Sequence, residues 1–366
     1  MSEDFLALAT EGVRGLTPYE PGKPIDELRR ELGLGDVVKL ASNESPLGPS
    51  PLALEAARRA LADIARYPDG NGFYLKQALA GRLGVSPAQL TLGNGSNDVL
   101  EFVVRAFAGP GQEVIYSQHA FAVYPLATRA VGAAGVQVPA RDFAHDLDAM
   151  LRAVTPRTRV VFVANPNNPT GTWVNGNALA TFVAALPPGV IVVVDEAYRE
   201  YVDEEGYPDC VQWLRERSNL VVTRTFSKAY GLAGLRVGYA VAHPQVADLL
   251  NRVRQPFNVN SVALAAAQAA LDDAEHLQRS RDINREGLLY LAAQLRRLGL
   301  AFIPSIGNFI SFELPGEAAP VYQALLREGV IVRPLAGYGM PRHLRVSVGL
   351  PDENQRFVQA LERVLA

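Results

Sequence analysis

One lysine of this chain has surroundings suited to covalent chemistry. The sequence contains four lysines, and Lys228 stands between hydroxyl residues and glycines in the run Thr-Phe-Ser-Lys-Ala-Tyr-Gly over 225–231. A lysine ammonium that is partly withdrawn from water loses its proton readily, and the neutral amine attacks aldehydes and carries protons. A general preference for arginine explains why lysines are few here, but it does not explain this position.

Two groups of residues suit a phosphate. Near Lys228, two hydroxyls and a guanidinium can converge on one anion, those of Thr225, Ser227 and Arg236. The second group is the turn Gly-Asn-Gly-Ser-Asn-Asp over 93–98, which leads into a helical pattern and so offers free backbone N–H groups. The alternative is a tight turn in which Ser96 or Asn97 only caps the helix.

An acid, a phenol and an amide also follow apolar runs. Asp195 ends the most apolar run of the chain, where an ionised carboxylate needs a cationic or donor partner, and Tyr198 comes three residues later. Asn168 belongs to Asn-Pro-Asn-Asn-Pro-Thr-Gly over 165–171, whose prolines make the turn rigid. An aldehyde cofactor with a phosphate, a pyridine nitrogen and a ring hydroxyl would use all these groups, which predicts pyridoxal 5′-phosphate.

The elements that position these groups form an α/β pattern. Short β-branched runs alternate with amphipathic helical segments, and the predicted strands cover 90–94, 113–117, 136–139, 160–165, 190–195, 220–225 and 237–242. Several runs are apolar at every position, as in strands buried on both faces of a mostly parallel sheet. Ligands bind beyond the carboxyl ends of such strands, where the candidate residues lie.

The pattern changes along the chain, and we predict three parts. Residues 1–40 contain many glycines and prolines and are expected to form an arm that packs on the smaller domain or on a partner. Residues 41–255 form the large α/β domain. Residues 256–366 form a smaller α+β domain, because a long helical stretch is followed there by short strands.

With these motifs in order, the whole chain resembles the fold-type I pyridoxal-phosphate aminotransferases of the aspartate aminotransferase superfamily, and within it the histidinol-phosphate branch. The resemblance implies the fold-type I PLP-transferase architecture. Besides the loops above, it is carried by KLASNESPLGPSP, RYPDG, GNF and GVIVRPLAGYGMPRHLRVSVG, at 39–51, 66–70, 307–309 and 329–349.

The resemblance implies roles by motif position. Lys228 matches the Schiff-base lysine, Asp195 the acid on the pyridine nitrogen, and Tyr198 and Asn168 the partners of the ring hydroxyl. The phosphate site matches Ser96, Asn97, Thr225, Ser227 and Arg236. Phe121 stands where an aromatic ring, often tyrosine in relatives, stacks on the cofactor. Tyr67 is similar to the tyrosine that reaches the phosphate in the neighbouring subunit, which implies a homodimer.

The resemblance also implies the substrates. Arg345 matches the arginine that holds the α-carboxylate, and Arg333 would hold a second anion, either the substrate phosphate or the distal carboxylate of glutamate. Tyr19 and Asn43 would close the pocket. The implied reaction interconverts histidinol phosphate and 2-oxoglutarate with imidazole-acetol phosphate and glutamate in histidine biosynthesis. Aromatic amino-acid aminotransfer and threonine-phosphate decarboxylation on the same scaffold are the alternatives.

Composition excludes several other classes of protein function. The net charge of −3 offers no basic surface for nucleic acid, and the longest apolar runs are too short to cross a membrane. One cysteine excludes an intrachain disulfide and a cysteine metal cluster, and no metal is expected. A regulator without catalysis would need a DNA-binding segment, and a dinucleotide-binding protein would need a third glycine after 93 and 95. We expect a cytoplasmic enzyme with small-molecule substrates.

Overall fold

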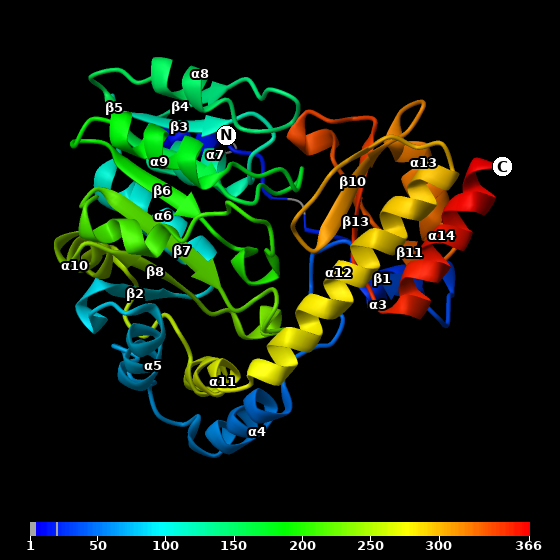
Figure 1. The fold of residues 1–366 in the computed structure, drawn as a ribbon, viewed down its shortest axis with the longest axis horizontal. Coiled ribbons are helices and arrows are strands. Elements are labelled where there is room, and N and C mark those ends of the chain that lie inside the picture. Colours follow the sequence, from blue (N-terminus) through cyan, green and yellow to red (C-terminus); the bar gives the residue numbers. More distant parts are fainter. Residues whose placement is uncertain (1–4, 20) are drawn as a thin grey trace.

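The larger sheet of the computed structural model, which describes residues 5–19 and 21–366, has seven strands (Figure 1). Their order is β2-β8-β7-β6-β5-β3-β4. Their bounds are β2 Leu90–Gly93, β3 Glu113–Ser117, β4 Ala134–Val138, β5 Thr158–Ala164, β6 Ile191–Asp195, β7 Leu220–Thr225 and β8 Gly238–Ala242. Only β8 runs antiparallel to its neighbours β2 and β7. The predicted α/β class with a mostly parallel sheet is confirmed.

Helices cover both faces of this sheet. Alternate residues of β5 and β6 point to opposite faces, so that Val161 and Val192 join one apolar cluster while Val160 and Val193 join the other. The first cluster is covered by α5 Phe73–Leu83, α8 Leu147–Arg152, α9 Gly176–Ala185 and α11 Ser261–Leu271, and the second by α6 Ser96–Phe107, α7 Val123–Ala130 and α10 Pro244–Val253. Burial on both faces explains why these strands are apolar throughout.

A second group of strands forms a smaller sheet in the order β12-β13-β10-β9. Its strands are β9 Phe302–Ile303, β10 Phe309–Glu313, β12 Arg333–Pro334 and β13 His343–Ser347. Beside it lie α12 Ala274–Arg297, α13 Ala318–Arg327 and α14 Pro351–Leu365 (Figure 1). A separate apolar cluster joins β10 and β13 to α12 and α14.

Helix α11 follows the predicted domain boundary at 255/256, but it packs in the apolar core of the larger sheet. The sequence predicts one long helical stretch here, but two aspartates divide it into α11 and α12, and Asp273 caps α12 by accepting from the His276 N–H at 3.1 Å. The alanine face of α11 packs on α5 and on α4 Pro51–Ala60, within the core of the larger sheet. The division into parts 1–40, 41–255 and 256–366 stays a prediction.

The N-terminal segment packs on elements of both the smaller and the larger part. Residues 1–4 and 20 of the predicted arm lie outside the described residues. The segment α3 Ile25–Leu32 packs on the smaller part through Leu28 and Leu326, and β1 Val38–Lys39 pairs with β11 Val330–Ile331. In contrast, α2 Glu11–Arg14 lies against α7, where a Cβ on Gly12 would stand 2.0 Å from the carbonyl oxygen of Arg129. The arm therefore also packs on the larger part.

The remaining helices are short. One α-helical turn is α1 Phe5–Leu8. The 3₁₀ helices are η1 Leu61–Asp63, η2 Pro87–Gln89, η3 Arg199–Tyr201, η4 Cys210–Arg215, η5 Ala233–Leu235 and η6 Ala336–Tyr338. No helix among the described residues is long and apolar enough to span a membrane. The cytoplasmic location stays a prediction.

Candidate active site

A cavity of about 190 Å³ lies at the carboxyl ends of β5, β6 and β7. Every site residue predicted from the sequence lines it except Tyr67: Tyr19, Asn43, Ser96, Asn97, Phe121, Asn168, Asp195, Tyr198, Thr225, Ser227, Lys228, Arg236, Arg333 and Arg345. These residues are up to 326 positions apart in the sequence, from Tyr19 to Arg345, and the parallel strands bring most of them to one edge of the sheet.

Asp195 is a buried carboxylate held by three donors. The Thr223 hydroxyl donates to Oδ1 at 2.9 Å, the Tyr124 hydroxyl donates to Oδ2 at 2.8 Å, and the Ala197 N–H also donates. Burial raises the pKa of Asp195, while these hydrogen bonds oppose the rise. The predicted partner of Asp195 is thus a set of neutral donors, and Asp195 lines the cavity.

Tyr124 contacts the candidate site through Asp195 and was not predicted from the sequence. Its side chain is fully buried, and its ring stacks on Phe162 with centroids 4.4 Å apart. Burial and the nearby Asp195 raise the pKa of Tyr124 well above its usual value, so the phenol remains a donor. Tyr124 lies on α7, three residues after Phe121, which precedes the helix. Nothing in the sequence pattern marked its hydroxyl as a partner of Asp195.

Tyr198 and Asn168, which were predicted to contact the ring hydroxyl of the cofactor, each accept a hydrogen bond from another residue of the site. Asn43 Nδ2 donates to Tyr198 Oη at 2.9 Å, and Arg345 donates to Asn168 Oδ1. Tyr198 is 3% exposed, and its pKa is raised by burial. Both the phenol and the amide therefore have fixed orientations at the cavity wall.

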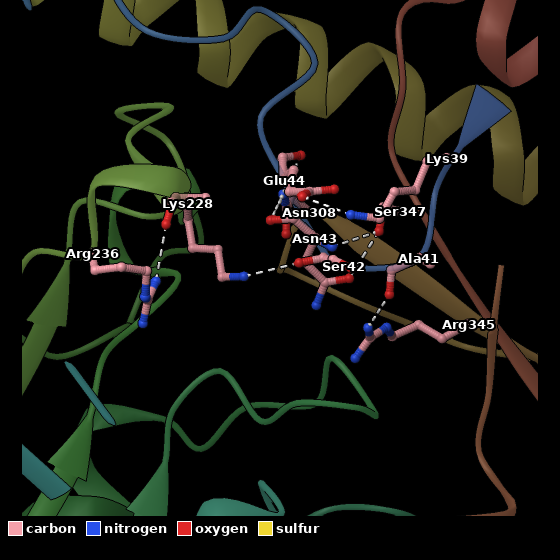
Figure 2. Close-up of polar contacts among 11 residues, drawn as sticks. Lys39, Ala41, Ser42, Asn43, Glu44, Lys228, Arg236, Asn308, Arg345 and Ser347 are labelled. Carbon is pink, nitrogen blue, oxygen red and sulfur yellow. Dashed lines mark hydrogen bonds and ion pairs between the residues drawn. The ribbon is translucent and has the colours of Figure 1, made fainter. Parts of the chain in front are cut away.

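Lys228 enters the cavity from the loop after β7 (Figure 2). Its Nζ donates to the carbonyl oxygen of Ser42 at 3.2 Å and lies 5.6 Å from the centre of the Tyr198 ring. Burial, together with the positive charge of Arg345, lowers the pKa of Lys228 to about 7. A large fraction of this amine is thus neutral near neutral pH and can act as a nucleophile or base.

The predicted phosphate residues converge where α6 begins. Gly95, with φ +82°, precedes the first residue of α6, and a Cβ there would stand 2.2 Å from Arg236 Nη2. Arg236 Nη1 donates to Ser227 Oγ at 3.2 Å (Figure 2). The glycine therefore allows the guanidinium to approach the N-terminus of a twelve-residue helix, so that positive charge and backbone N–H groups meet at one place.

Two arginines lie on the side of the smaller sheet. Arg345 on β13 donates to the carbonyl oxygen of Ala41 at 2.7 Å, and its Nε has no hydrogen-bond partner among the described residues (Figure 2). Arg333 lies 5.5 Å from the centre of the Tyr19 ring. Arg333 and Tyr19 also line a neighbouring cavity of about 620 Å³.

Tyr67 lies outside the cavity of its own chain. Its side chain is 83% exposed, and its ring stacks on Phe257 with centroids 4.8 Å apart.

The cavity wall also contains residues that were not predicted from the sequence: Gly22, Ala41, Ser42, Ala164, Pro166, Ala197 and Tyr338. Backbone carbonyls such as those of Ala41 and Ser42 leave no signal in residue type.

These residues fit pyridoxal phosphate. Asp195 offers a carboxylate that accepts from neutral donors and forms no ion pair with the described residues, and Lys228 offers a primary amine of lowered pKa. Arg236 and the start of α6 bring positive charge and backbone N–H groups together, and any side chain at position 95 would clash with the guanidinium. The pyridinium, aldehyde and phosphate of the cofactor match these three features in chemistry.

Comparison with known proteins places the chain in a family. Residues 35–361 match the family described as "Aminotransferase class I and II". "Histidinol-phosphate aminotransferase 2" of Pseudomonas aeruginosa is 63% identical over 365 residues, which are 99% of both chains. The chain belongs to the histidinol-phosphate aminotransferase family. "Histidinol-phosphate aminotransferase 1" of Nitrosococcus oceani is 58% identical over 361 residues, 99% of this chain and 98% of its own.

A solved structure agrees with this assignment. Histidinol-phosphate aminotransferase from Sinorhizobium meliloti, in complex with pyridoxal-5′-phosphate, superposes with a TM-score of 0.90 at 31% identity, covering 98% of this chain and 97% of its own. Aspartate aminotransferase from Thermus thermophilus with maleate has a TM-score of 0.84 at 24% identity, with 97% and 99% covered, and supports the fold alone. The predicted fold-type I architecture and aminotransferase activity are confirmed.

Proposed function

We propose that this aminotransferase interconverts histidinol phosphate and 2-oxoglutarate with imidazole-acetol phosphate and glutamate. The observation that carries the proposal is one cavity lined by a lysine of lowered pKa, a buried aspartate and the buried arginine Arg345. The relatives with about 60% identity bear the name of this reaction. Histidine biosynthesis is the corresponding pathway.

The residues that would hold pyridoxal phosphate follow from their chemistry. Asp195 would bind the pyridinium nitrogen, and Tyr198 and Asn168 the ring hydroxyl. Phe121 would cover a ring face, and the phosphate would be bound by Ser96, Asn97, Thr225, Ser227 and Arg236. When bound, the cofactor supplies an aldehyde for the amino group and an electron sink for the Cα–H bond.

Lys228 would act as the proton carrier of the reaction. Its neutral amine accepts the Cα proton as a general base and returns it as a general acid, which a pKa near 7 favours in both directions. Arg345 orients the amino or keto acid, because a guanidinium binds a carboxylate through two parallel hydrogen bonds. That orientation would present the Cα–H bond to Lys228.

The two substrates differ at their far ends, which Arg333 would have to accommodate. Histidinol phosphate carries a phosphate and no carboxylate, whereas glutamate carries a second carboxylate. Arg333 stands between the site and the neighbouring cavity, so an anionic end of either substrate can reach it. The same position suits an aromatic amino acid, and aromatic aminotransfer therefore remains the second candidate function.

Steady-state kinetics test the substrate. We expect catalytic efficiency for histidinol phosphate to exceed that for phenylalanine and tyrosine by at least about 10-fold, with 2-oxoglutarate as acceptor. Higher efficiency for an aromatic amino acid would give the alternative function. Release of carbon dioxide from threonine phosphate would identify the decarboxylase instead.

Absorption spectroscopy tests the cofactor. Pyridoxal phosphate added to the purified apo-protein should develop a visible band, and borohydride reduction should fix the label on a peptide that contains Lys228. A Lys228→Ala variant should neither form the band nor retain the label. A reduced label on that variant would rule out Lys228 as the attachment site.

The same proposal includes a homodimer in which Tyr67 completes the partner's site. Several apolar side chains close to Tyr67 in the sequence are also exposed, those of Leu61, Ile64, Phe73 and Tyr74. Sedimentation should give a dimer. Lys228→Ala and Tyr67→Ala variants, refolded together, should recover activity, because each mixed dimer then has one site with both wild-type residues. Recovery no greater than that of the separate variants would place Tyr67 outside the site.

A further inference from the structure

Asn43 has a strained backbone at the centre of the site. It lies in the segment 41–44, which passes between Lys228 and the strands β10 and β13 (Figure 2). Its side chain is 1% exposed, and its φ is +54°, a region that residues other than glycine seldom occupy. Such strain persists only where the surroundings hold it, and it concentrates at functional sites.

Hydrogen bonds with Ser347 on β13 and with Asn308, which precedes β10, hold Asn43 in place. The Asn43 N–H donates to Ser347 Oγ at 2.8 Å, so the single proton of that hydroxyl is free to donate elsewhere, and it donates to Asn43 Oδ1 at 3.0 Å. Asn308 Nδ2 donates to the Asn43 carbonyl oxygen at 3.0 Å. The amide oxygen therefore faces β13, and the amide nitrogen faces the opposite way.

On that opposite side the amide meets Tyr198. Asn43 Nδ2 donates to Tyr198 Oη at 2.9 Å, so the phenol oxygen is an acceptor in this contact. Burial raises the pKa of Tyr198, which keeps its proton at neutral pH. No other described residue accepts that proton, and Tyr198 lines the cavity. The phenolic O–H is therefore available to a group in the cavity.

We propose that Asn43 is a positioning residue that directs the Tyr198 hydroxyl proton toward the ring oxygen of pyridoxal phosphate. This inference rests on the proposed function. The left-handed backbone at position 43 lets one side chain contact Ser347 and Tyr198 together. Ser347 follows Arg345 by two residues on β13, so both side chains lie on one face of that strand. Asn43 thus links Tyr198 to the strand that carries Arg345.

Two substitutions separate the amide from the backbone. Asn43→Gly keeps a residue that adopts positive φ and removes the amide, whereas Asn43→Ala also strains the backbone. A hydrogen bond donated to the ionised ring oxygen favours its ionised form. We expect Asn43→Gly to move the pH midpoint of the cofactor's visible band upward by about one unit. We also expect its Kd for pyridoxal phosphate, measured by titrating the apo-protein, to rise about 10-fold.

A double-mutant cycle with Tyr198→Phe decides whether Asn43 acts through the phenol. If it does, Asn43→Gly changes neither the pH midpoint nor the Kd in the Tyr198→Phe background. Equal changes in both backgrounds, or no change in the wild-type background, would overturn the proposal. Asp142→Gly is the matched control, because Asp142 also has positive φ, +51°, but lies outside the cavity, and its substitution should leave both readouts unchanged.

The outcome for this proposal is distinct from that for the function. If the wild-type protein forms no visible band with pyridoxal phosphate, the proposed function fails, and the Asn43 proposal fails with it. If the wild-type band forms and the cycle shows no coupling, only the Asn43 proposal fails. Asn43→Gly serves as the test even if Asn43→Ala does not fold.

Discussion

At the scale of single residues, burial shifts the pKa of both Asp195 and Lys228. Asp195 loses hydration, which raises its pKa, and recovers part of the stabilisation of its charge from Tyr124, Thr223 and the Ala197 N–H. Lys228 loses hydration beside Arg345, which favours its neutral form. The proposed chemistry requires an aspartate carboxylate stabilised by hydrogen-bond donors and a lysine amine in its neutral form.

Removing the Tyr124 hydroxyl should weaken cofactor binding. Tyr124→Phe keeps the stacking on Phe162 but removes one donor from Asp195, whose pKa then rises. A hydrogen bond to a charged group contributes about 1.5–3 kcal/mol, so titration of the apo-protein should show a Kd for pyridoxal phosphate at least about 10-fold higher. Tyr116→Phe, which removes another buried phenol, should bind as the wild type does. Equal Kd values for the wild type and Tyr124→Phe would contradict the assigned role.

Replacing Lys228 should stabilise the apo-protein in a pH-dependent way. Because its folded-state pKa is lowered from 10.5 to about 7, the cost of burying the lysine is full below pH 7 and disappears as the pH rises to 10.5. Lys228→Met should therefore raise the free energy of unfolding at pH 7 by about 2 kcal/mol, allowing for partial solvation. Thermal unfolding should show a gain in Tm that shrinks toward pH 10. A gain that is constant from pH 7 to 10 would exclude this cause.

At the scale of elements, the phosphate site depends on close contact between β8 and the start of α6. A Cβ on Gly238 would stand 2.4 Å from the Ser96 backbone nitrogen and 3.0 Å from the Arg224 carbonyl oxygen. Both atoms belong to the backbone and cannot rotate away as a side chain could. The glycine therefore sets the distance between the strand and the helix N-terminus.

Gly238→Ala should harm stability and cofactor binding together. Forcing a methyl group into this contact should lower the free energy of unfolding of the apo-protein by about 3 kcal/mol and move α6 away from Arg236. Urea denaturation and titration with pyridoxal phosphate measure the two effects. Gly234→Ala is the control, since a Cβ there meets no atom within 4 Å and the backbone lacks positive φ. Equal behaviour of the two variants would show that the contact does not limit binding.

At the scale of the whole molecule, a buried histidine makes global stability sensitive to acid. His145 is 7% exposed, and its Nε2 lies 2.8 Å from the carbonyl oxygen of Ala164, at the end of β5. Burial lowers the pKa of His145 to about 4. Between pH 6.5 and 4 the unfolded chain therefore binds a proton that the folded chain does not bind, and stability falls as the pH falls.

The slope of stability with pH should show this contribution. Over that interval His145 should account for a loss of about 3 kcal/mol in the free energy of unfolding, and His145→Gln should remove most of it. Urea denaturation at pH 6.5, 5.5 and 4.5 measures the slope. His243→Asn, which retains a side chain able to cap α10, serves as the control and should keep the wild-type slope. An unchanged slope in His145→Gln would assign the acid sensitivity to other groups.

The sequence by itself determined the sheet and most residues of the cavity. Strands buried on both faces must be apolar throughout, so Asp195 and Lys228 stood out as polar residues where such runs end. Parallel strands then bring their carboxyl ends to one edge, which made a shared site predictable before any contact was known. The resemblance added Arg345 and Tyr67, to which periodicity alone assigned no role.

Only the tertiary structure decided which groups touch those residues. In the sequence Tyr124 resembles any helix tyrosine, yet its hydroxyl donates to Asp195. Asn43 contacts Tyr198, 155 positions later, and Ser347, 304 positions later. The packing of α11 on the larger part was also hidden, because an alanine-rich helix can pack on either neighbour. Hydrogen-bond direction, backbone strain and packing partner depend on distances between segments, and local sequence does not encode these distances.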